Sequence, residues 1–144
     1  MKLLASAFLA VFALAVAEAA VAGEGVEYLY RLHCSGCHGA DGTGSKVGRI
    51  PPFPGMVGHF ADNPKGRLYL VHVPGIANAA LPDAETANIL NYVLHTWGGA
   101  GAGAKQDFSA EEVHSLRAVH VDDVAAFRHQ LAVELAKQGV LMSY

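Results

Sequence analysis

The chain has 144 residues, of which 52% are hydrophobic, so it is long enough for one small domain with a buried core. The formal net charge is −3 and the cationic residues form no cluster, which argues against nucleic acid as a partner. The two cysteines lie three residues apart in one motif, which excludes a small fold held together by several disulfides.

The N-terminus has the composition of an export signal. Lys2 precedes an uncharged apolar run from Leu3 to Ala17, and the small residues that follow offer cleavage points after Ala19 or Ala22. The run is shorter than the about 20 residues that a membrane-spanning helix needs, so an uncleaved anchor is the weaker alternative. We predict a signal peptide over residues 1–22 and a mature protein that is exported to the periplasm.

The first part of the mature chain predicts helices separated by one irregular stretch. Residues 24–33 carry apolar side chains at spacings of three and four, which is the period of a helix. Glycine and proline break up residues 36–54 too often for a long regular element. A short helix is expected over residues 65–72, and Pro74 is expected to stop it because proline has no amide hydrogen to donate.

The clearest helix is predicted over residues 83–97. Pro82 stands before it, and Asp83 and Glu85 lie near its positive end. One face of this helix carries an apolar stripe, made of Ala87, Leu90, Val93, Leu94 and Trp97.

Beyond this helix the sequence predicts a linker and two more helices. Residues 98–105 are rich in glycine and alanine, as flexible linkers are. Ser109 and Glu112 have the spacing of a capping box that opens a helix to about residue 119. A final helix is expected over residues 122–138. No strand pattern is found, so the fold class is all-α, with one domain over 23–99 and a helical extension over 100–144.

The cysteine motif lies in the segment HCSGCHGADGTG, residues 33–44, and three chemistries compete for it. A structural zinc site needs four ligands, usually as two pairs, and the chain has one CxxC and no HxxxH nearby. A thiol–disulfide exchange motif normally follows a strand, whereas a helix is expected here. In CxxCH the two thiols add to heme vinyl groups and the histidine ligates the iron, which explains more of the residues.

Over about residues 24–99 the chain resembles class I c-type cytochromes. The resemblance is carried by CSGCHGADGTG, by PPFPG and by NYVL in the helix over 83–97. It implies a small cytochrome c fold around one covalently bound heme c, with Cys34 and Cys37 as thioether attachment points. It also implies His38 as the proximal iron ligand and the carbonyl of Pro51 as acceptor of a hydrogen bond from His38.

Two further features follow from the same resemblance. Tyr30 and Tyr92 are expected where the first and last core helices cross, with plain core packing as their role. Relatives often carry a glycine eight residues before the first cysteine, where this chain has Val26.

The second axial ligand of the iron is not evident. Relatives usually supply a methionine from the loop that corresponds here to residues 73–83, which contains neither Met nor His. His72 is a candidate ligand, with an exposed histidine and a distal-pocket residue as alternatives. Met56 is a less favoured ligand because it follows PPFPG on the proximal side, and Met142 lies close to the C-terminus. His59 is a candidate contact of a heme propionate.

The sequence therefore favours an electron-transfer protein and not an enzyme. Its partners would be redox proteins, such as a periplasmic dehydrogenase and a downstream acceptor, with no nucleic acid and no permanent membrane span. Two alternatives stay open: a five-coordinate heme that binds or senses a small ligand, and a cytochrome subunit of a dehydrogenase complex. In the second, residues 100–144 would dock on the partner, whereas in a free carrier they would pack back on the domain.

Overall fold

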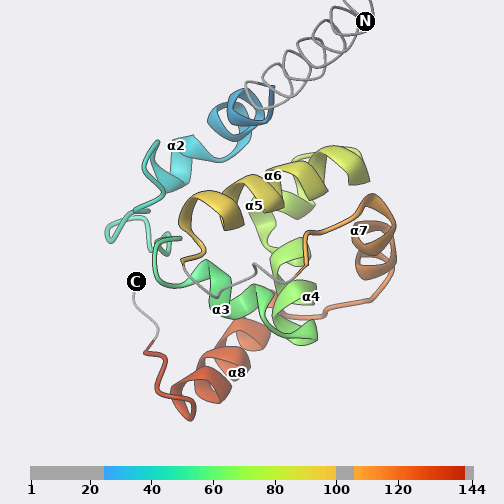
Figure 1. Ribbon diagram of the computed structural model, residues 1–144. Helices are drawn as coiled ribbons and strands as arrows, with labels where there is room; N and C mark the ends of the chain where they lie inside the picture. The colour runs from blue at the N-terminus through green and yellow to red at the C-terminus, as the bar shows by residue number, and fades with distance from the viewer. Residues whose placement is uncertain (1–24, 100–105, 142–144) are drawn as a thin grey trace, which may run out of the picture.

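A computed structural model describes residues 25–99 and 106–141 of the chain. The regular structure in these two ranges is helical, apart from one isolated bridge between Ser45 and Ile50, which confirms the predicted all-α fold (Figure 1). None of the helices in these ranges is both long and apolar enough to cross a membrane. The predicted signal peptide, most of the predicted linker and Met142 lie outside the described residues.

The helices follow the predicted order. A first helix covers residues 25–33, and the others are α2 (Ser35–His38), α3 (Val57–Ala61), α4 (Pro64–His72), α5 (Pro74–Ala77), α6 (Asp83–Trp97), α7 (Ala110–Arg117) and α8 (Val124–Ala136). The predicted bounds hold for α6 and, within one residue, for α4. α7 is shorter than predicted at its C-terminal end, and α8 is shorter than predicted at both ends.

The short helices α2, α3 and α5 were not predicted, and α5 shows why. Pro74 ends α4, as expected, since the backbone turns to an extended conformation at Val73. The same proline then occupies the first position of α5, where a missing amide hydrogen costs nothing. One residue therefore separates two helices, which fixes the direction of the chain at the end of α4.

An aromatic cluster forms where the first helix crosses α6. The ring of Tyr30, which is 1% exposed, lies 5.0 Å from the ring of Trp97 and 5.5 Å from that of Tyr92, centroid to centroid. Gly42 has a φ of 70°, and a Cβ at this position would lie 2.9 Å from the Trp97 ring. The predicted crossing of the two helices at Tyr30 and Tyr92 is confirmed.

The C-terminal extension shares the core of the preceding helices. Val113 and Leu131 are 0% and 1% exposed, and they belong to the same apolar cluster as Tyr30 and Leu90. α7 contacts α4 and α6, and α8 contacts α4. Figure 1 shows α8 on the far side of α3 and α4 from α6.

A bidentate ion pair fixes α7 on α4. Ser109 caps α7 as predicted, with its hydroxyl accepting from the amide of Glu112 at 3.2 Å. The Glu112 carboxylate does not complete the predicted capping box. Instead, it accepts from Nε and Nη2 of Arg67, each at 2.6 Å, because a guanidinium offers two charged donors where the Ser109 amide offers one neutral donor.

Candidate functional site

The CxxCH motif is held on a short helix that continues from the first one. The amide of Cys34 donates to the carbonyl of Tyr30 at 2.8 Å, and α2 then carries Cys37 and His38 over its single turn. Cys34 is half-buried and Cys37 is exposed, and no disulfide joins them. The two sulfurs and the imidazole are thus presented together by five consecutive residues.

His38 is oriented by the loop that follows it. Its Nδ1 lies 3.2 Å from the carbonyl oxygen of Pro51, and its ring stacks on that of Phe53 with 4.1 Å between centroids. The loop is closed by main-chain bonds from Gly44 to His38 and from Phe53 to Gly42, each 2.8 Å long. Because a carbonyl oxygen only accepts, Nδ1 carries the hydrogen and Nε2 keeps a lone pair for a metal.

Burial lowers the pKa of His38, although the hydrogen bond to Pro51 opposes this shift. The ring is therefore held neutral, which is the form that binds a metal ion. The contact that the sequence led us to expect between His38 and Pro51 is present in the structure.

The three residues of the motif line an apolar cavity of about 490 Å³. This size is within the range of about 300–1,000 Å³ that is usual for cofactor sites. The rest of its wall comes from aliphatic and aromatic residues of α3 to α6 and from the start of α8, among them Phe60, Leu70, Ile76, Leu90, Val93 and Val124. The cavity is thus closed partly by the C-terminal extension.

Two arginines interrupt this apolar wall. Arg49 comes from the loop after the motif, and Arg128 comes from the second turn of α8. A heme has an apolar macrocycle and two negatively charged propionate groups, so the two arginine side chains are complementary in charge to the propionates. Arg49 and Arg128 are site residues that the sequence analysis missed.

The other chemistries proposed for the motif fit less well. Among the described residues, no group of three or more His, Cys, Asp or Glu side chains is placed to hold a metal ion. Burial raises the pKa of the Cys34 thiol to about 11, with the neighbouring Cys37 adding to the shift. An exchange-active thiol needs a lowered pKa, whereas a thiol bound in a thioether needs no ionisation.

The candidate second ligands lie in different places. Met56 lines the cavity. His72 does not, because its Nδ1 lies 2.9 Å from the carbonyl oxygen of Leu68 and its Nε2 lies 2.9 Å from that of Val119. The structure therefore turns both ring nitrogens of His72 toward backbone carbonyls and away from the cavity.

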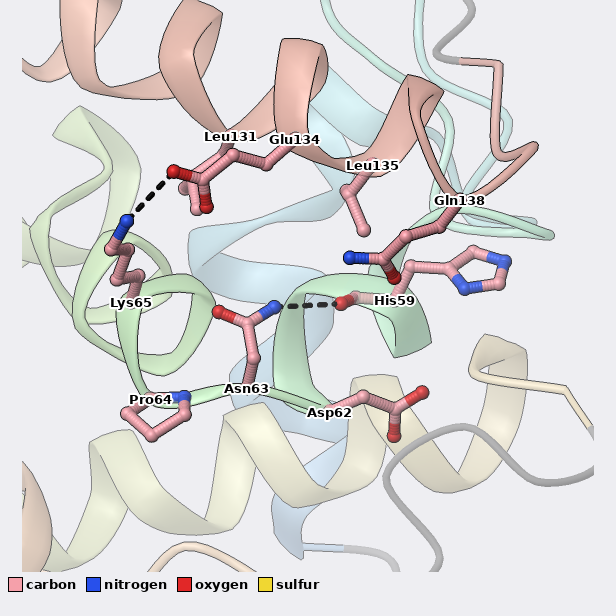
Figure 2. Close-up of a pocket in the computed structure, with 9 residues that line it drawn as sticks. All are labelled: His59, Asp62, Asn63, Pro64, Lys65, Leu131, Glu134, Leu135 and Gln138. Carbon is pink, nitrogen blue, oxygen red and sulfur yellow. Dashed lines mark hydrogen bonds and ion pairs between the residues drawn. The ribbon is translucent and has the colours of Figure 1, made fainter.

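His59 also lies apart from the motif. It lines a second pocket of about 450 Å³ between α3, the start of α4, and α8 (Figure 2). Asp62, Lys65 and Glu134 line the same pocket, and Lys65 pairs with Glu134 at 2.7 Å. His59 is not among the residues that line the cavity of the CxxCH motif, so the structure offers no support for a propionate contact there.

The helical fold and the CxxCH motif on an apolar cavity define a protein built around covalently attached heme. No protein-family profile matches the sequence. The chain is 34% identical over 137 residues to a cytochrome c-552 of Thermus thermophilus, an alignment that covers 82% of this chain and 88% of that protein. A second cytochrome c-552 from Thermus thermophilus is 34% identical over 104 residues, or 59% of this chain and 79% of its own length.

The chain therefore belongs to the c-type cytochromes. It binds one heme c covalently and transfers electrons, and it is not an enzyme. These assignments agree with the resemblance stated from the sequence.

Proposed function

We propose that this chain is a periplasmic electron carrier that binds its heme through thioethers at Cys34 and Cys37, with His38 as one axial ligand. The observation that carries the proposal is the hydrogen bond between Nδ1 of His38 and the Pro51 carbonyl, beside two cysteines on the wall of the same cavity. This bond leaves Nε2 of the neutral ring as the nitrogen available to iron.

Each residue has a defined part in holding the group. Each cysteine S–H adds across one vinyl C=C bond, so a C–S bond and a C–H bond form and no atom leaves. Arg49 and Arg128 would hold the propionates, and the apolar wall would exclude water from the macrocycle. When bound, the heme supplies a one-electron Fe(III)/Fe(II) couple whose potential depends on its axial ligands and on burial.

Electrons would enter and leave at the edge of the group near Cys37. Cys37 is exposed, so a group attached to it would reach the surface there. Leu32, two residues before Cys34, is 60% exposed and offers an apolar contact next to this edge. We propose weak, short-lived docking of a periplasmic dehydrogenase as donor and of a downstream acceptor at this place.

Export is part of the proposal because covalent attachment keeps the cofactor on the protein after it has left the cytoplasm. The apolar N-terminal run and the small residues before Gly23 support cleavage after Ala22. Expression in a bacterium that attaches heme to exported apocytochromes would give a periplasmic red protein whose first residue is Gly23. A protein retained in the cytoplasm, or one with Met1 intact, would contradict the export proposal.

Substitutions in the motif test the attachment. Cys34→Ala and Cys37→Ala each leave one thioether, so we expect the α-band of the pyridine complex to move to longer wavelength in both. Ser35→Ala is the matched control, since it changes a neighbour whose hydroxyl bonds only to the Arg31 carbonyl at 2.7 Å. Equal spectra for the control and the cysteine variants would contradict attachment at these residues.

A further inference from the structure

Most of the side chains that line the cavity cannot bind iron. Protein ligands to heme iron are His, Met, Cys and Tyr side chains. Pro51 and Phe53 contact the His38 ring and so lie on its own side. Where α4 meets α5, the cavity is lined by Leu70, Val73, Pro74 and Ile76, none of which is a ligand of this kind.

Two side chains of suitable chemistry line the cavity but are held elsewhere. The backbone of Met56 is tied to the residue whose ring stacks on His38, because its amide donates to the Phe53 carbonyl at 3.0 Å. The ring of Tyr69 packs between those of Phe60 and Phe127, at centroid distances of 5.0 Å and 6.3 Å, and is 7% exposed. Ligation by Tyr69 would take its ring out of these two aromatic contacts.

The histidines near the cavity are also accounted for. Both ring nitrogens of His72 lie at 2.9 Å from backbone carbonyls, one of them in the loop before α8. Ligation by His72 would take its ring away from both of these carbonyls. His33 is exposed at the rim, directly before Cys34, on the side of the attached edge.

We infer that the sixth coordination position of the iron is left open by the described residues and accepts a small uncharged ligand such as carbon monoxide or nitric oxide. The inference rests on the proposed ligation by His38. The aliphatic residues where α4 meets α5 favour this class, because they offer no hydrogen bond to an anion that loses its hydration on entry.

Such a site regulates the carrier through linkage. Ligand affinity and electron affinity change each other by the same factor. A ligand that binds the reduced protein more tightly raises the midpoint potential by about 59 mV for each tenfold difference in affinity. The bound ligand would therefore hold the electron on this protein and slow its delivery to the acceptor.

The test uses the purified holoprotein and its visible and electron paramagnetic resonance spectra. We expect a high-spin ferric signal, a high-spin ferrous spectrum, and conversion of the ferrous form by carbon monoxide. Azide added to the ferric form is expected to bind at least tenfold more weakly than carbon monoxide binds to the ferrous form. Low-spin spectra in both oxidation states that carbon monoxide leaves unchanged would overturn the inference, and so would tighter binding of azide.

Three variants make this result specific. Met56→Ala, His72→Ala and Met142→Ala are each expected to keep the wild-type spectrum. Met142 lies outside the described residues and is included because it is the other methionine of the mature chain. A low-spin wild type that turns high-spin in one variant would identify a protein ligand, which would overturn this inference but not the proposed function. Absence of covalent heme would instead overturn the proposed function, so the two failures are distinguishable.

Discussion

The ion pair between Arg67 and Glu112 joins the C-terminal extension to α4, and its charge can be removed without changing its shape. The two side chains are only 12% and 28% exposed. Arg67 also donates to the Gln106 carbonyl at 3.2 Å, and its guanidinium carbon lies 3.7 Å from the centroid of the Phe108 ring. We predict that Glu112→Gln destabilises the whole protein and not the extension alone.

The magnitude follows from the contacts. A hydrogen bond to a charged group contributes about 1.5–3 kcal/mol, and an amide retains part of one such bond. The cation–π contact with Phe108 stays, so we expect a loss of about 2–3 kcal/mol in the free energy of unfolding. The matched control is Glu134→Gln, which removes the charge of the Lys65–Glu134 pair, whose side chains are 63% and 47% exposed. Exposed pairs contribute about 0.2–1 kcal/mol, so this change should be small.

The assay is urea unfolding of the holoprotein, followed by far-ultraviolet circular dichroism and by heme absorbance. Both signals should give one transition, at a lower urea concentration in Glu112→Gln and nearly unchanged in Glu134→Gln. Two separate transitions, or equal effects of the two substitutions, would refute the reasoning that residues 106–141 belong to one cooperative unit.

Three further predictions concern the site and its surroundings. Tyr30→Phe removes the hydrogen bond from the Tyr30 hydroxyl to the Gly39 carbonyl at 2.7 Å and should cost about 1–2 kcal/mol of stability in urea unfolding. Burial raises the pKa of Tyr30 to about 12, so wild-type stability should fall as pH rises from 10 to 12, and a variant with the same alkaline loss would contradict this assignment. His72→Ala should destabilise the holoprotein by about 1 kcal/mol because the ring N–H loses its carbonyl acceptor, while the visible spectrum stays unchanged, and a spectral change would show that His72 contacts the heme. Arg128→Leu should lower the midpoint potential by about 40 mV, the equivalent of about 1 kcal/mol for a one-electron couple, and a potential that stays constant in redox titration would place Arg128 away from the propionates.

Local signals explain which elements the sequence predicts well. The bounds of α6 follow from Pro82 at one end and Gly98 at the other, with an apolar stripe between them. The chemistry of the CxxCH motif can be predicted from the sequence because its two cysteines and its histidine lie on one turn. The contact between His38 and Pro51 was expected from the family resemblance, and the loop closed at Gly42 produces it.

The parts that were missed depend on contacts between distant residues. Arg128 reaches the cavity because α8 packs on α4, about ninety residues after the motif, and no periodicity in the sequence reports this. The His72 ring bonds to Val119 in the extension, so helix position alone could not show where it points. Glu112 had the spacing of a capping box, but a better donor, Arg67, was brought near it by the fold.

Covalent attachment of heme at Cys34 and Cys37 is tested most directly by the intact mass of the mature protein, taken before and after treatment with a thiol-alkylating reagent. We predict a mass equal to the polypeptide from Gly23 plus one heme, unchanged by the reagent and by extraction with acidified acetone. A colourless polypeptide that gains two alkyl groups would contradict the account.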